Sequence, residues 1–336
     1  MYLTLQQRKY VKILFHFLIQ GTIFAIAFAL IITRDFHLPA ISRALAMGFT
    51  ISLFSVLGDR FILHSLRNLP FRYYIFLKTL YISIISALVV YLGTFHFSEI
   101  PMDLSKNALI IIVIVIASGI SAFYNLLMVI DRMLGSNMIF NIITGKYHQP
   151  VEEERIFMFL DMVSSTAVAE RIGHIQFYKF LNEVFTDITE YIVNSGGEIY
   201  KYVGDEVIIS WPITQGLRKN RCTELYFRVS ERLHSHRAYY ENKYNVSPYF
   251  RAGMHIGKVI VGQLGKEKRE LAFLGDTVNT TARIQGMCKL KQQDLLISEA
   301  LYLRLPHPEI YRAHSFGLIH LRGRSKEIRI YSLQKR

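Results

Sequence analysis

The longest apolar stretch of the chain, residues 108–130, is the feature that most restricts how it can fold. It contains 23 residues and no charged side chain. An α-helix rises about 1.5 Å per residue, so a helix of this length is longer than the roughly 30 Å hydrocarbon core of a bilayer. Hydrophobic residues also make up 51% of the chain, which is high for a soluble protein. The stretch therefore predicts a transmembrane helix.

Three more apolar runs cover residues 13–33, 44–58 and 79–95. The second run is the shortest, and it extends back to residue 39 if the Arg43 side chain reaches the interface. Together the four runs predict a four-helix transmembrane domain in residues 1–135, embedded in a lipid bilayer. A cleaved signal peptide is the alternative for the first run, because Arg8, Lys9 and Lys12 precede it. The length of that run and the three later runs favour a span.

Basic residues predict the orientation of these helices. Four spans place both ends of the domain on one side, and the N-terminus and the loop between the second and third runs are rich in Arg and Lys. The loop that contains Glu99, Asp103 and Lys106 is net acidic. By the positive-inside rule, we expect a multi-pass protein of the cell (inner) membrane whose N-terminus and second half are cytoplasmic. The net charge of +13 divides into +7 for residues 1–150 and +6 for the remainder. Basic inner loops explain the first part, so no nucleic acid partner is expected. For the second part, the alternatives are a solvated basic surface and attraction of a polyphosphate substrate.

Residues 136–153 are expected to link this part to a second domain, residues 154–336. Residues 136–145 would continue the last span as a coupling helix, and the following "GKYHQPVEEE" contains the Gly, Pro and charge run of a boundary. His16 and His64 are expected near the inner face, and His37 and His96 near the outer face. Haem ligation by such histidines is an alternative to ordinary interfacial histidines, which are commoner.

The stretch "IYKYVGDEVIIS", residues 199–210, predicts a β-hairpin in the second domain. Strand-forming residues flank Gly204 and Asp205, a pair that suits the positive φ angles of a two-residue turn. Asp205 is then either a turn residue or a metal ligand. Because magnesium and manganese need several oxygen ligands, the second interpretation requires another carboxylate nearby.

Asp161 is the expected partner of Asp205. It ends a short apolar run, "RIFMFLD", and a helical pattern follows that continues until Gly196 and Gly197. A strand, a helix and a hairpin in this order can bring the end of the first strand beside the hairpin turn. The helix start offers unpaired backbone N–H groups for phosphate. These groups belong to Val163, Ser164, Ser165 and Thr166. Two carboxylates, divalent cations and an anion-binding helix end are typical of nucleotidyl transfer.

Four segments, in order, resemble class III adenylate/guanylate cyclases over residues 150–333. They are "FMFLDMVSST", "YKYVGDEV", "FRAGMHIGKVIVGQLG" and "FLGDTVNTTARIQ". Diguanylate cyclases have a similar hairpin, but they carry two glycines before the acidic pair, and here Val203 takes the first place. The last two segments have no counterpart there. The resemblance implies an α+β catalytic domain of ferredoxin-like (palm) fold that works as a homodimer with shared active sites.

The resemblance also implies roles for individual residues. Asp161 and Asp205 would hold two ions of Mg²⁺ or Mn²⁺, with the Met162 carbonyl as an extra ligand. Asn279 would orient the ribose and Arg283 would stabilise the transition state, and their i, i+4 spacing places them on one helix face. The alternatives are a surface ion pair for Arg283 and a helix cap for Asn279. Glu206 is expected to face the other side of its strand and is assigned no chemistry.

Base selection is expected to depend on Lys201, which matches the adenine-reading lysine of family members that use ATP. An ammonium group only donates, so it suits the acceptor N1 of adenine and not the N1–H of guanine. Ala272 stands where an assisting aspartate or threonine is usual. Arg322 matches a residue that contacts the terminal phosphates, with Arg324 as a competitor and a solvated basic turn as the alternative.

The activity implied by these residues is conversion of ATP to cyclic AMP. Guanylate cyclase, diguanylate cyclase and a nucleotide-binding receptor without catalysis are the alternatives.

Overall fold

The computed structural model describes residues 38–61, 71–96, 145–267, 269–321 and 327–336, with Thr22 and nine further residues between 111 and 130. The chain divides into two compact units, Met1–Leu134 and Gly135–Arg336, and each is described by itself. Several expectations lie outside the described residues: most of the spans 13–33 and 108–130, the coupling helix 136–145 up to Gly145, His16, His37, His64, Arg322 and Arg324.

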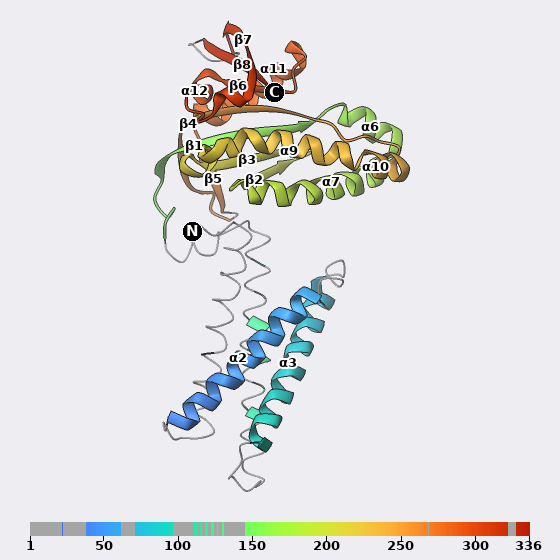
Figure 1. Ribbon diagram of the computed structural model, residues 1–336, viewed down its shortest axis with the longest axis vertical. Coiled ribbons are helices and arrows are strands. Elements are labelled where there is room, and N and C mark those ends of the chain that lie inside the picture. The colour runs from blue at the N-terminus through green and yellow to red at the C-terminus, as the bar shows by residue number, and fades with distance from the viewer. Residues whose placement is uncertain are drawn as a thin grey trace. The chain divides into compact units, whose positions relative to one another are not determined.

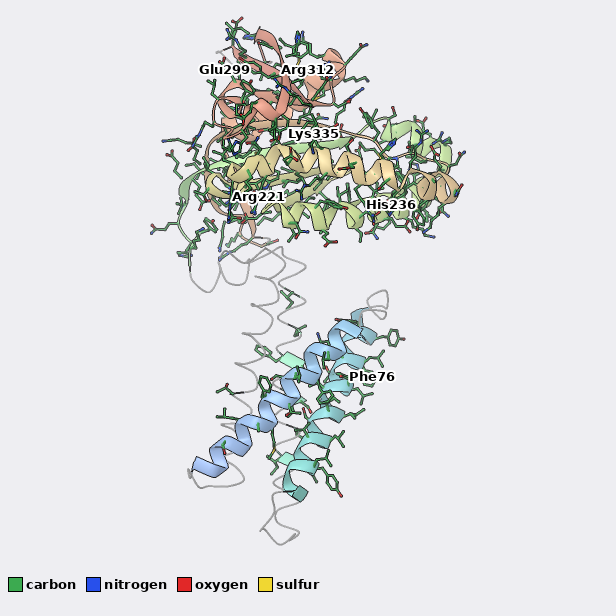
Figure 2. All side chains as sticks on the ribbon, in the orientation of Figure 1. Phe76, Arg221, His236, Glu299, Arg312 and Lys335 are labelled. Atoms are coloured by element: carbon green, nitrogen blue, oxygen red, sulfur yellow. The ribbon has the colours of Figure 1, made fainter. Side chains whose placement is uncertain are left out.

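Two long helices are described in the first unit, α2 (Leu38–Phe61) and α3 (Phe71–His96). They pack together where Tyr81 donates a hydrogen bond of 2.9 Å to the Phe54 carbonyl. Gly58 permits this contact, because a Cβ atom there would lie 2.3 Å from the Tyr81 ring. Phe76 is 63% exposed on α3 (Figure 2). Within the ranges that the structure describes, no helix is both long enough and apolar enough to cross a membrane.

The described strands of the second unit form one eight-stranded sheet in the order β2-β3-β1-β4-β6-β8-β7, with β5 paired to β4 (Figure 1). The pair β4–β6 is parallel and the other pairs are antiparallel. The strands are β1 (Val151–Met162), β2 (Glu198–Val203), β3 (Glu206–Pro212), β4 (Phe250–Leu264), β5 (Glu270–Leu274), β6 (Leu295–Ser298), β7 (Tyr311–Ile319) and β8 (Ile328–Lys335).

Helices pack on both faces of this sheet. The α-helices are α6 (Ser165–Ile172), α7 (His174–Asn194), α8 (Ile213–Gly216), α9 (Arg221–Ser235), α10 (Arg237–Tyr244), α11 (Asp276–Lys291) and α12 (Glu299–Tyr302). Two short 3₁₀ helices are also described, η3 (Arg218–Asn220) and η4 (Pro308–Ile310).

The alternation of side chains along β1 decides which face each residue serves. Met158 and Leu160 are fully buried in the main core, which they share with apolar residues of α7 and α9. Phe157 and Phe159 belong to a second cluster on the opposite face. Because side chains alternate along a strand, Asp161 points to the same face as Phe157 and Phe159. The end of β1 therefore places a carboxylate on the face away from α7 and α9.

The hairpin prediction is confirmed and the single long helix is wrong. Val203 pairs with Glu206 across a two-residue turn in which Gly204 has φ of +64°. The helix expected from about residue 166 to residue 194 is interrupted at Gly173, where φ is +81°. A positive φ cannot continue a right-handed helix, so the chain starts again as α7.

Candidate active site

The carboxylates of Asp161 and Asp205 meet at the edge where β1 ends and the β2–β3 hairpin turns. The antiparallel register of β1 and β3 sets Asp161 opposite Glu206, and Asp205 directly precedes that residue in the turn. The two aspartates interact through their carboxyl groups, and burial together with the charge of Asp205 raises the pKa of Asp161. The predicted convergence of the two aspartates is therefore confirmed.

This pair of carboxylates fits a divalent cation. Like charges held close together favour a bound positive charge, and hard oxygen donors suit Mg²⁺ or Mn²⁺. Among the described residues, no group of three or more His, Cys, Asp or Glu side chains could hold a metal. Magnesium is commonly bound through one or two carboxylates with water and substrate phosphates, so two aspartates are sufficient protein carboxylates.

Glu206 contradicts the expectation that it faces away from the site. Residues directly opposite in an antiparallel pair share a face, so Glu206 lies on the same face as Asp161. Burial first, and then the charges of Asp161 and Asp205, raise the pKa of Glu206 to about 7. A third carboxylate therefore borders the predicted metal site. The expectation failed because the turn separates Asp205 from the strand whose alternation was assumed.

Gln285 is a residue of this site that the sequence did not indicate. Its Nε2 donates a hydrogen bond of 3.0 Å to Oδ2 of Asp161. This bond orients the carboxylate and partly offsets the rise of its pKa that burial and Asp205 cause. Helix α11 approaches β4 closely at Gly253, where a Cβ atom would lie 2.2 Å from the Gln285 backbone nitrogen. The glycine in "FRAGMHIG" was the available signal, because a strand glycine often marks a close backbone approach.

The predicted phosphate cradle is only partly available. The Val163 N–H donates to the Tyr249 carbonyl at 2.9 Å, so the assignment of Val163 as a free phosphate donor is wrong. Ser164 has φ of +61° and caps α6 without a side-chain hydrogen bond, and the helix begins at Ser165. Backbone donors for phosphate would therefore come from Ser165 and Thr166. The roles of Ser164, and of the Met162 carbonyl at the end of β1, stay predictions.

Asn279 and Arg283 lie in α11, and neither alternative for them is supported. The helix begins at Asp276 with Gly275 as its cap, so Asn279 is inside the first turn and is not the cap. The Arg283 side chain is half-buried, and its Nη1 has no hydrogen-bond partner among the described residues. Their catalytic roles stay predictions.

Helix periodicity places Arg283 away from the side of α11 that contacts Asp161. Gln285 contacts Asp161, and Arg283 precedes it by two residues, which corresponds to about 200° around an α-helix. Asn279, four residues before Arg283, shares the Arg283 side. Helix α11 thus carries the two parts of the predicted machinery on different sides.

Lys201 lies on β2 and forms an ion pair with Glu270 of β5. Its Nζ is 2.7 Å from Glu270 Oε2, and the two side chains are 42% and 39% exposed. The hydrogen bond to Glu270 raises the pKa of Lys201. Ala272, two residues further along β5, is buried. Glu270 was not indicated by the sequence, because nothing local connects it to a residue 69 positions earlier.

Known proteins resemble the second unit in sequence and in fold. Residues 147–335 match the family described as the adenylate and guanylate cyclase catalytic domain. The chain is 33% identical over 204 residues to adenylate cyclase 2 of Rhizobium meliloti (strain 1021), which covers 61% of this chain and 56% of that protein. It is 27% identical over 186 residues to adenylate cyclase 1 of the same organism, over 54% of this chain and 27% of that protein. The chain thus spans about half or less of the length of these relatives.

Among solved structures, a bacterial light-regulated adenylyl cyclase is similar with a TM-score of 0.57 and 21% identity. The likeness covers 65% of this chain and 64% of that chain. The adenylyl cyclase CyaB from P. aeruginosa has a TM-score of 0.50 and 18% identity, over 56% of this chain and 97% of that chain. At such identities the likeness concerns the fold alone. The α+β fold expected for the second domain is confirmed.

Proposed function

The chain belongs to the adenylate and guanylate cyclase catalytic domain family, and we propose that it is an adenylate cyclase that converts ATP to 3′,5′-cyclic AMP and pyrophosphate. The observation that carries this proposal is the convergence of Asp161 and Asp205, since the register sets Asp161 opposite Glu206 and Asp205 directly precedes Glu206 in the turn. It joins two of the four sequence motifs at one edge of the sheet. Relatives named as adenylate cyclases support ATP as the substrate.

In the proposed reaction, the ribose 3′-oxygen loses its proton to solvent and attacks the α-phosphorus in line. One P–O bond forms, the bond to the β-phosphate oxygen breaks, and pyrophosphate leaves. Asp161 and Asp205 would hold a divalent cation, whose positive charge would lower the pKa of the hydroxyl and neutralise the phosphates. Arg283 stabilises the negative charge that develops during the transfer. Gln285 holds the Asp161 carboxylate in one orientation.

Two chains are required by this proposal. Gln285 and Arg283 lie on different sides of α11, so the arginine that serves one pair of aspartates comes from a second copy of the chain. A two-fold axis then creates two equivalent sites, each with Asp161 and Asp205 from one chain and Lys201, Asn279 and Arg283 from the other. ATP would bind between the two copies.

The test of activity uses the full chain incubated separately with ATP and with GTP, in Mg²⁺ and in Mn²⁺, followed by chromatography of the products. We expect cyclic AMP from ATP. Asp205→Asn is the control for chemistry, because asparagine also suits the turn while it weakens metal binding. Its rate should fall by on the order of a thousandfold or more. Cyclic GMP from GTP alone would make the protein a guanylate cyclase of the same family. A linear guanylate dimer or its cyclic form would support the diguanylate alternative, and no product would support the receptor.

Residues 1–135 are proposed to form a multi-pass domain of the cell membrane with the catalytic unit on the cytoplasmic side. Support comes from the sequence, above all from the 23 uncharged residues at 108–130. Alkaline carbonate washing of membranes from expressing cells tests this: the full chain should stay in the pellet. Release of the full chain into the supernatant would contradict the membrane assignment.

A further inference from the structure

The ion pair between Lys201 and Glu270 joins two strands that are not neighbours in the sheet. Among the described strands, β2 pairs with β3 alone, and β5 pairs with β4. Beside the ion pair, the Phe273 N–H donates to the Tyr200 hydroxyl at 3.3 Å, and the two rings meet edge to face with centroids 4.8 Å apart. These contacts hold the backbones of β2 and β5 close to each other, and with them the side chains of Lys201 and Glu270.

Glu270 lies on the same strand as Ala272, which stands where a residue that accepts a hydrogen bond from the base is usual. Side chains at i and i+2 point to one face of a strand, so Glu270 and Ala272 share a face of β5. The Ala272 methyl group cannot accept a hydrogen bond. A glutamate two residues away has a longer side chain, and in this structure it reaches the ammonium group of Lys201.

The chemistry of adenine matches such a pair. Its Watson–Crick edge presents an acceptor at N1 directly beside a donor at the exocyclic amino group. A reader of both atoms needs a donor and an acceptor side by side, and Lys201 Nζ and Glu270 Oε2 are 2.7 Å apart. A carboxylate accepts several hydrogen bonds at once, so its bond to Lys201 does not prevent it from accepting the amino group.

We propose that Glu270 is a specificity-determining residue of the base pocket, in which Lys201 donates to N1 of adenine and Glu270 accepts from the exocyclic amino group. The inference rests on the proposed conversion of ATP. It assigns to Glu270 the function that Ala272 cannot perform. A purely structural role for the pair is the competing explanation, but an ion pair as exposed as this one contributes little to stability.

The test removes the amino group from the substrate and the carboxylate from the protein. The full chain and its variants are assayed with ATP, GTP and purine riboside triphosphate, which has N1 but no exocyclic amino group. The wild type should prefer ATP over the analogue in kcat/KM by on the order of tenfold to a hundredfold, the effect of a hydrogen bond to a charged group. In Glu270→Ala this preference should fall to near one.

Two further variants separate specificity from folding. Glu270→Gln keeps the side-chain volume and one acceptor oxygen, so its preference should be intermediate. Glu152→Ala removes the carboxylate of a comparable pair, in which Lys258 Nζ lies 2.7 Å from Glu152 Oε1 on more exposed side chains. It should keep the full preference for ATP, because neither Glu152 nor Lys258 belongs to the predicted site.

The outcomes of this experiment are distinct. An unchanged preference in Glu270→Ala, or no preference in a wild type that makes cyclic AMP, overturns the role of Glu270 and leaves the proposed activity standing. If the wild type cyclises only GTP, the adenylate cyclase proposal is refuted before any variant is compared. The proposed recognition of adenine by Glu270 is then refuted as well.

Discussion

Replacing Gly253 by alanine should push helix α11 away from the sheet and impair both folding and catalysis. Gly253 lies in the interior of β4, and its paired position on β1 is Phe159. An added Cβ atom would lie 2.2 Å from the backbone nitrogen and 2.5 Å from the Cα of Gln285. Both groups are backbone atoms, so no side-chain rotation relieves the clash. The helix or the strand itself must move.

The size of the effect follows from that geometry. Ordinary contacts of a Cβ atom begin at 3.4 Å, so the backbones must separate by about 1.2 Å along the direction of the clash. Overpacking of this kind costs about 1–3 kcal/mol, and we expect the upper end because a central strand and a helix are both involved. In a unit of this size, about 3 kcal/mol corresponds to a fall in Tm of about 6–12 °C.

Activity should fall as well, because α11 carries Gln285 against Asp161 on one side and Arg283 on another. A misplacement of about 1 Å can cost on the order of a hundredfold in rate. Cyclic AMP production at a temperature where the variant is fully folded measures this loss separately from unfolding.

Trp211 makes the stability measurement specific. It is the single tryptophan of the chain and is fully buried in the core of the second unit. Its fluorescence during heating therefore reports on the catalytic unit whatever the first unit does.

Gly286→Ala is the matched control on helix α11, because an added Cβ atom at Gly286 meets nothing within 4 Å. That variant should gain about 0.5–1 kcal/mol from helix propensity. If Gly253→Ala were as stable and active as the wild type, the close packing of α11 on β4 would be wrong.

Three more predictions concern the carboxylates and the dimer. Asp205→Ala and Arg283→Ala chains should each be inactive, but their co-expression should restore roughly a quarter of wild-type activity, because about half of randomly paired dimers are mixed and each has one intact site. If differential tagging demonstrates mixed dimers and activity still does not recover, both residues act in the site of one chain. Gln285→Leu should weaken Mn²⁺ binding by about 10–100-fold, measured by electron paramagnetic resonance, since it removes the hydrogen bond that orients Asp161. The raised pKa of Glu206, about 7 against 4.5, means that the folded state keeps a proton that the unfolded state loses. Stability in EDTA should therefore fall as pH rises from about 4.5 to about 7, and Glu206→Gln should flatten this fall, which urea unfolding at pH 5 and pH 8 would detect.

The local features of the catalytic unit were readable from the sequence. The β2–β3 hairpin follows from Gly204 and Asp205 between two strand-forming runs, because a two-residue turn needs residues that accept its φ angles. The shared side of Asn279 and Arg283 follows from helix periodicity once α11 is recognised. The hairpin and the shared helix side depend on neighbours within a few residues. The meeting of Asp161 and Asp205 was predicted differently, from the order of a strand, a helix and a hairpin, which can bring the end of the first strand beside the turn.

One local feature predicted from the sequence, a single continuous helix, was wrong. The apolar spacing that runs through residues 168–192 continues across Gly173, so periodicity indicated a single helix. The positive φ of Gly173 divides it, and periodicity describes which side chains are buried, not whether the backbone is continuous.

Tertiary structure alone decided which distant residues complete the site. The register of β1 on β3 placed Glu206 opposite Asp161, the approach of α11 at Gly253 brought Gln285 to a carboxylate 124 positions earlier, and the contacts between β2 and β5 paired Lys201 with Glu270. The physical reason is that strand register and helix docking are set by the simultaneous packing of both faces of the sheet. Local backbone preferences along the chain do not contain that information, because the atoms that make these contacts are neighbours only after the sheet has formed.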